Sequence, residues 1–167
     1  MRIPLLSTLL AGSILLTGSC FVGLAQSGGS YGKELSRPVR FDLGETHFLP
    51  GDSITIDSMR GTADSVAPGN LFEIKGHYML ASHPSAELAV NVTSRNAAPS
   101  TGMQLQHVDV NQGSGTFTVY LYMWGEGWPH LSFYPTGGGS SFSALYFGNG
   151  NTLMRQSSSQ PHDTVTQ

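Results

Sequence analysis

Hydrophobic and polar residues alternate along most of this chain, which is the pattern of a β-strand with one buried face. The alternation is clearest at 53–59, 71–81, 87–93 and 117–123, and shorter extended runs lie at 39–43, 130–134 and 143–147. No comparable stretch has the 3.6-residue period of an amphipathic helix. We therefore expect an all-β domain.

The phase of the alternation changes once. Met103 and Leu105 are odd-numbered, whereas the next apolar residues, Val108 and Val110, are even-numbered. A β-bulge near Gln106–His107 is the simplest cause of such a change, because it inserts one residue into one strand of a pair.

Glycine-containing turns separate the extended runs. Pro68-Gly69 suits the centre of a type II turn, since proline presets φ and glycine accepts a positive φ. Gly113-Ser114-Gly115 and Gly125-Glu126-Gly127 are typical of hairpin turns, as are Gly137–Gly139 and Asn149-Gly150 between the last strands. About eight short strands at regular spacing predict an antiparallel β-sandwich, immunoglobulin-like or jelly-roll-like.

The N-terminal residues have the features of a signal peptide. Arg2 precedes an apolar stretch from Ile3 to Leu16, and the small residues Gly23 and Ala25 suit cleavage after Ala25. The apolar stretch is shorter than the roughly 20 residues that a membrane-spanning helix needs. We expect residues 1–25 to direct export to the periplasm or the extracellular space, with no transmembrane helix in the mature chain.

Cys20 provides an alternative fate for this segment. It is the only cysteine, and the Gly-Ser before it is typical of bacterial lipoprotein signals, although Thr17 stands where such signals favour leucine. Lipidation at Cys20 would make a membrane-anchored lipoprotein. Cleavage after Ala25 would instead leave a chain without cysteine.

The remaining chain divides by composition into three parts. Residues 26–36 are rich in glycine and serine and predict a flexible linker. Residues 156–167 are polar and contain Pro161, as in disordered tails. The predicted β-sandwich domain occupies residues 37–155.

Charge is scarce in this chain. Charged residues make up 11% of the sequence, against about 25% in ordinary soluble domains, and the formal net charge is −3. Nucleic-acid binding is excluded because it requires a dense Lys/Arg surface. A helical bundle is disfavoured because its exposed faces would need more Glu and Lys. Binding should depend little on salt, since long-range electrostatic steering is weak.

One aromatic and polar cluster is a candidate ligand site. Trp124 and Trp128 flank a tight turn with Glu126 at its tip, Tyr122 before it and His130 beyond it. A sugar-binding platform needs flat aromatic faces and nearby polar groups, which this turn supplies. The alternative is that the two tryptophans cap one end of the core, because Trp buries a large area.

Recognisable catalytic and metal-binding motifs are missing. There is no G-x-S-x-G, and the six histidines lack H-x-x-x-H or H-E-x-x-H spacing. Asp52, in a turn before a strand, suits either a Ca²⁺ ligand or an Asx-turn on its own backbone. Glu73 and Glu87 suit a hydrolytic carboxyl pair by residue type only, and their outward positions favour a solvated face. We expect no catalytic residue, metal or cofactor.

Several stretches are similar to those of a bacterial protein family. They are Gly51–Ile56, Met59–Thr62, Tyr78–His83, Leu88–Thr93, His130–Pro135 and Gly139–Gly148. Together they resemble a family of exported β-sandwich proteins of planctomycete-type bacteria that has no assigned chemistry. The resemblance implies export and a sandwich fold, and it transfers no catalytic residue. In a bacterial context, Asn91-Val92-Thr93 is a poor glycosylation site.

These observations predict an exported, non-enzymatic binding or structural module of the cell envelope, with an envelope protein or a glycan as its partner. The alternative is a carbohydrate-binding module that uses Trp124 and Trp128. A small hydrolase is the third hypothesis.

Overall fold

The computed structural model describes residues 35–95 and 106–155. The predicted signal peptide with Cys20, linker residues 26–34, the tail 156–167, and Met103 and Leu105 of the predicted bulge lie outside the described residues. Within the described part, the strands are β1 (Arg37–Pro38), β2 (Asp42–His47), β3 (Ser53–Gly61), β4 (Leu71–Ser94), β5 (His107–Tyr122), β6 (Gly127–Tyr134) and β7 (Ser143–Gly148). A short 3₁₀ helix, η1 (Gly150–Thr152), follows them.

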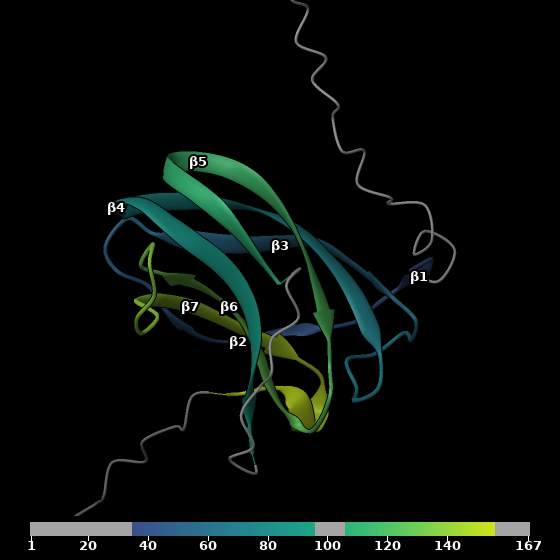
Figure 1. Ribbon diagram of the computed structural model, residues 1–167. Helices are drawn as coiled ribbons and strands as arrows, with labels where there is room; N and C mark the ends of the chain where they lie inside the picture. The colour runs from purple at the N-terminus through teal and green to yellow at the C-terminus, as the bar shows by residue number, and fades with distance from the viewer. Residues whose placement is uncertain (1–34, 96–105, 156–167) are drawn as a thin grey trace, which may run out of the picture.

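The prediction of an antiparallel all-β fold is confirmed. Every strand ladder is antiparallel, and the strands form a single sheet in the order β1-β3-β4-β6-β7-β2, with β5 also paired to β4. The sheet is curled into a half-barrel, with β4 and β5 as long arching ribbons (Figure 1). The described residues contain seven strands, not about eight, and the finer sandwich class is not confirmed.

Two long strands replace four predicted short ones. The runs at 71–81 and 87–93 are both parts of β4, and Gly113-Ser114-Gly115 lies inside β5. The prediction of a hairpin turn at these glycines is therefore wrong. The glycines let β5 bend while it stays paired with β4, with Gly113 at a φ of 105° opposite Leu80.

The second glycine turn also has another role than predicted. β5 and β6 do not form a ladder with each other, and each pairs with β4. Tyr122 lies opposite Leu71 at the start of β4, whereas Gly127 lies opposite Ser94 at its end. The segment 123–126 is therefore a crossing between two ends of the sheet. The hairpin predicted at 137–139 is confirmed, since β6 and β7 pair around it.

β4 is the central strand of the fold. β5 follows one edge of β4 through both halves, while the other edge pairs first with β3 and then with β6. The register with β5 shifts between Leu80 and Ser85, so four residues of β4 lie opposite the single residue Gln112. β4 bends at this interruption, and the backbone groups there lose their ladder partners.

Asp52 supplies the partners that are missing at the bend. Its Oδ1 accepts hydrogen bonds from the backbone N–H groups of Ala81 (2.9 Å) and Ser82 (3.0 Å). The side-chain Nε2 of Gln112 donates to the Ala81 carbonyl (3.1 Å), and Pro84 has no N–H to satisfy. One carboxylate and one amide side chain therefore replace the interrupted ladder.

The second oxygen of Asp52 connects the bend to another strand. Oδ2 accepts hydrogen bonds from the hydroxyls of Ser82 (2.7 Å) and Ser143 (2.8 Å), and Ser143 begins β7. The Ser143 hydroxyl also accepts the Leu49 N–H at 3.1 Å. The buried Asp52 thus joins the start of β3, the bend of β4 and the start of β7. The Asp52 carboxylate therefore binds donors of β4 and β7, whereas an Asx-turn would have bound the backbone of its own loop.

A tight turn brings Asp52 to this position. The Asp52 N–H donates to the Leu49 carbonyl (3.0 Å), with Pro50 and Gly51 at the centre of the turn. Gly51 has a φ of 85°, and a Cβ placed there would lie 2.8 Å from the Ala81 Cβ. Glycine is therefore required both by the left-handed backbone and by the close approach of β4.

Burial would raise the pKa of Asp52, but the hydrogen bonds from Ser82, Ser143 and the Ala81 and Ser82 backbone outweigh it. The net result is a pKa below the ordinary value. Asp52 is therefore a carboxylate at neutral pH, as its four donors require.

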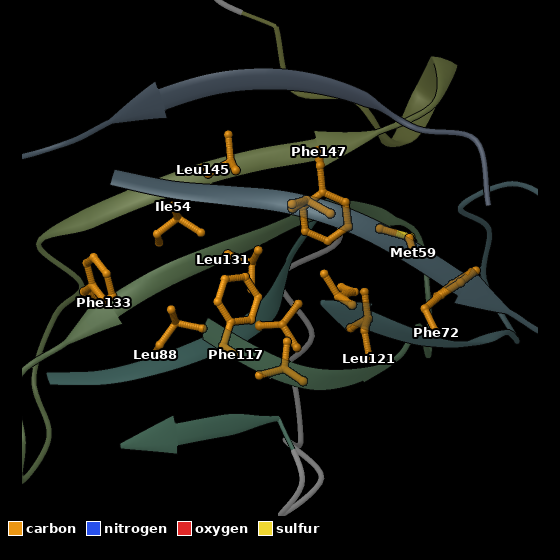
Figure 2. Packing of buried hydrophobic residues seen from close by; sticks show 14 of the residues in the cluster. Ile54, Met59, Phe72, Leu88, Phe117, Leu121, Leu131, Phe133, Leu145 and Phe147 are labelled. Carbon is orange, nitrogen blue, oxygen red and sulfur yellow. The ribbon is translucent and has the colours of Figure 1, made fainter. Parts of the chain in front are cut away.

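The hydrophobic core lies inside the curl of the sheet. Figure 2 shows side chains of β3, β4, β5, β6 and β7 meeting there. The largest fully buried side chains are Phe72, Phe133, Phe147, Ile74, Leu80, Leu88, Leu121, Met123 and Leu131. Phe72, Ile74, Leu80, Leu88, Leu121 and Met123 are inward positions of the predicted alternation, so the pattern placed this part of the core correctly.

Replacing Asp52 with alanine should lower the free energy of unfolding by about 3 kcal/mol, because four donors, the buried Ser143 hydroxyl among them, lose a buried and charged acceptor. Urea denaturation measures the change. Asp57→Ala is the matched control: Asp57 is an exposed partner of His77, and surface pairs contribute at most about 1 kcal/mol. Equal losses in the two variants would contradict the role of Asp52.

The lowered pKa of Asp52 predicts the direction of a pH effect. The unfolded chain takes up a proton at Asp52 near pH 4, whereas the folded chain does so only at lower pH. The stabilisation is therefore complete above about pH 4 and is lost as the pH falls further. In urea titrations, Asp52→Asn should show a shallower loss of stability with acid than the wild type, and parallel curves would refute this origin.

Candidate ligand-binding site

The five residues of the predicted ligand site separate into two groups. Tyr122 ends β5, Trp124 and Glu126 lie in the crossing segment, and Trp128 and His130 belong to β6. The crossing leads the chain from one end of β4 to the other, so the two tryptophans have different neighbours. The printed ring contacts differ accordingly: Trp124 contacts Tyr122, and Trp128 contacts Arg95.

Trp124 is the most exposed large hydrophobic residue of the described chain, with 66% of its surface accessible. Its ring contacts Tyr122 edge-on, with ring centroids 4.3 Å apart and planes at 71°. Met123, between them in sequence, is fully buried and its N–H donates to the Asn70 carbonyl (3.0 Å). The buried Met123 anchors a segment whose next side chain, the indole of Trp124, extends into solvent.

Trp128 is held by a cation. The Arg95 guanidinium carbon lies 5.3 Å from the centroid of the Trp128 ring, within the range of a cation–π contact. The same guanidinium donates to the Asn151 carbonyl, and the Arg95 N–H reaches the Glu126 carbonyl at 3.5 Å. Arg95 thus links the half-buried Trp128 and the crossing segment to Asn151 in the C-terminal part of the domain.

His130 lies beside Trp128 on the same face of β6. It is buried, with 7% of its surface accessible, and its ring lies 4.9 Å from the ring of Tyr146 at a tilt of 35°. Its Nδ1 is 3.3 Å from the Trp128 carbonyl, which can only accept, so Nδ1 carries the proton. Burial lowers the pKa of His130 more than this hydrogen bond raises it.

The outer face of β6 continues beyond His130 as a row of polar and aromatic residues. Asn91 of β4 donates a hydrogen bond to the Tyr134 hydroxyl (3.0 Å). Ser132 lies between Ala89 and Ala144 in the ladders, and all three are buried. The Ser132 hydroxyl has no hydrogen-bond partner among the described residues. Sequence reasoning placed neither Ser132 nor Tyr134 in a ligand site, although the even numbering of 128, 130, 132 and 134 implies a common face.

A serine, a histidine and an aspartate do meet in this fold, in an order that does not activate the serine. The Ser82 hydroxyl donates to Asp52 at 2.7 Å, so His83 Nδ1, 2.8 Å away, must be the donor to Ser82. In a catalytic triad the histidine accepts the serine proton instead. The His83 ring stacks on Phe142, with centroids 4.0 Å apart. This cluster therefore supports the bend of β4.

The candidate carboxyl pair does not form a site. Glu73 and Glu87 lie on opposite sides of the bend in β4. Glu73 binds Lys75 (3.0 Å) and the Tyr120 hydroxyl (3.1 Å), and Glu87 lies 3.7 Å from His107. No group of three or more His, Cys, Asp or Glu residues that could hold a metal occurs in the part of the chain that the structure describes. In the same part, no helix has the length and apolar character needed to cross a membrane.

Comparison with known proteins identified no relative of this chain. No family model matches this chain, and no similar protein was found among the curated proteins or the solved structures. The resemblance to exported proteins of planctomycete-type bacteria therefore stays a prediction.

The lowered pKa of His130 leads to a further expectation. In a proton NMR titration, the ring signals of His130 should have a midpoint below the value of about 6.5 measured for histidine in short peptides. The physical reason is the cost of placing a charge in this buried position. A midpoint at or above the peptide value would contradict the enclosed environment.

Proposed function

We propose that this chain is an exported, non-enzymatic binding module of the cell envelope, and that it binds neutral polysaccharide through Trp124 and Tyr122. The exposure of Trp124 carries the proposal. Its ring is supported on one side by Tyr122 and is otherwise largely open to solvent.

An exposed indole is well suited to a sugar ring. The C–H face of a pyranose is flat and apolar and packs against an aromatic face, while its hydroxyls need hydrogen-bond partners at the edge. Glu126, two residues from Trp124 and exposed, supplies acceptor oxygens on the same segment. Aromatic side chains also add contact area at a low cost in conformational entropy, because they have few rotatable bonds.

Trp128 has a supporting role in this proposal. Its contact with Arg95 and its half-buried state make it part of the frame that holds the crossing segment. The proposal therefore moves the main contact of the predicted module from the pair Trp124 and Trp128 to the pair Trp124 and Tyr122.

The composition supports a neutral ligand. Charged residues are few; the crossing segment contains Glu126, and Arg95, whose N–H contacts the Glu126 carbonyl, is engaged by Trp128 and Asn151. Export is supported by the signal-like residues 1–25, with lipidation at Cys20 as the alternative that would anchor the module to a membrane. We also propose that the curled sheet belongs to the immunoglobulin-like or jelly-roll-like class of sandwich.

Replacing Trp124 with alanine should abolish or weaken polysaccharide binding by about tenfold or more, the usual effect of removing a central aromatic contact. Affinity electrophoresis against a panel of soluble neutral polysaccharides measures it, followed by calorimetry with the glycan retained. Leu43→Ala is the matched control, because Leu43 is also an exposed apolar residue (57%) and lies on β2. Stability should be nearly unchanged in both variants.

A wild-type protein that binds no glycan in the panel, or a Trp124→Ala variant that binds as well as Leu43→Ala, would refute the proposal. Measuring the affinity at increasing NaCl concentration distinguishes a neutral ligand from a charged one. Binding that falls steeply with salt would contradict a neutral polysaccharide, because screening acts on charged contacts.

A further inference from the structure

β5 has a long free edge. Its 16 residues pair with β4 along one side, and no described strand lies along the other. An unpaired edge presents a row of N–H and C=O groups that another strand can bind.

The hydrogen bond at the end of the β4–β5 ladder shows which residues of β5 direct their backbone N–H and C=O groups to the free edge. The Met123 N–H donates to the Asn70 carbonyl, so Met123 faces β4. Backbone groups of successive residues point to alternate edges of a strand. The odd-numbered residues 117, 119 and 121 therefore face β4, and the even-numbered residues 116, 118, 120 and 122 direct their N–H and C=O groups to the free edge.

This edge lacks the features that protect the other edges of the sheet. β1 has only two residues, one of them Pro38, and covers part of β3. β2 carries Asp42 and Glu45, and the Glu45 N–H is already bound to the Met154 carbonyl. From Gln112 to Tyr122, β5 contains no Lys, Arg, Asp, Glu, His or Pro. Natural edge strands usually carry such residues to prevent pairing.

The segment Thr116–Tyr122 is complementary to itself in the antiparallel direction. When two copies are aligned on Val119, each Thr118 lies opposite a Tyr120 and each Thr116 opposite a Tyr122. On the inner face, Phe117 lies opposite Leu121. Aromatic residues opposite β-branched or aliphatic ones are favourable cross-strand pairs, and no charge meets a like charge.

We propose that this protein forms a two-fold symmetric dimer in which the β5 strands of two copies pair antiparallel, centred on Val119. The pairing gives the free N–H and C=O groups of both β5 strands hydrogen-bond partners at once. Because both copies use the same surface, the assembly ends at two chains. It extends the two sheets into one across the dimer. The interface shares Tyr122 with the proposed polysaccharide site, but its tests use no glycan, so either proposal can fail without the other.

Residue-resolved hydrogen exchange on the full mature chain tests the proposal directly. As protein concentration rises, the amides of Thr116, Thr118, Tyr120 and Tyr122 should become protected, whereas those of Phe117, Val119 and Leu121 are protected throughout by β4. Sedimentation over the same range should show a monomer–dimer equilibrium. A monomer at every concentration, or even-numbered amides that stay unprotected in a dimer, would overturn it.

Thr118→Pro provides the mutational test. Proline removes an N–H that faces the free edge and leaves the hydrogen bonds to β4 in place, so the dissociation constant should rise by about tenfold or more. Thr118→Ser is the matched control, because it keeps the amide and the hydroxyl. A dimer equally tight in both variants would refute the β5 interface, and growth to larger oligomers would refute the closed pair. The exchange experiment on wild-type protein decides the question even if Thr118→Pro does not fold.

Discussion

The carboxylate of Asp52 is the interaction on which the shape of this domain depends. A strand as long as β4 can serve two halves of a sheet only if it bends, and bending interrupts its ladder with β5 between Leu80 and Ser85. Asp52 accepts the N–H groups of Ala81 and Ser82 at this interruption, and its bond to the buried Ser143 secures β7 at the same point. The curl of the sheet and the enclosed core follow from this one buried anion.

The scarcity of charge connects the remaining features. With few Lys, Arg, Asp and Glu residues to distribute, the exposed positions of β5 from Gln112 to Tyr122 are Gln, Ser and Thr. The same shortage leaves β5 without a charged side chain from Gln112 to Tyr122. Several of the charged residues that are present form surface pairs, such as Lys75 with Glu73 and His77 with Asp57.

The alternation of residues predicted the core well, because inward and outward positions are set locally by burial. Ile54, Ile56, Leu88 and Val90 are all buried as expected. Turns were predicted less well, because a glycine allows either a reversal of the chain or a bend within one strand. At Gly113, the pairing with β4 keeps the chain in one bent strand. The partners of Asp52 were out of reach, because Ser82 and Ser143 lie 30 and 91 residues away. The crossing of the chain between Trp124 and Trp128 was also not predicted, because no local signal in the sequence distinguishes it from a hairpin turn.

The pairing of β2 with β7 has a consequence for synthesis. Asp42 lies opposite Gly148, so an early strand has to wait for one made about 100 residues later. At about 5–20 residues per second, β2 leaves the ribosome roughly 5–20 s before its partner exists. The β3–β4 and β4–β5 ladders can form in that interval from segments close in sequence. Closure by β2 and β7 then becomes a late step, and a chain truncated before β7 retains an open sheet that cellular proteases can recognise.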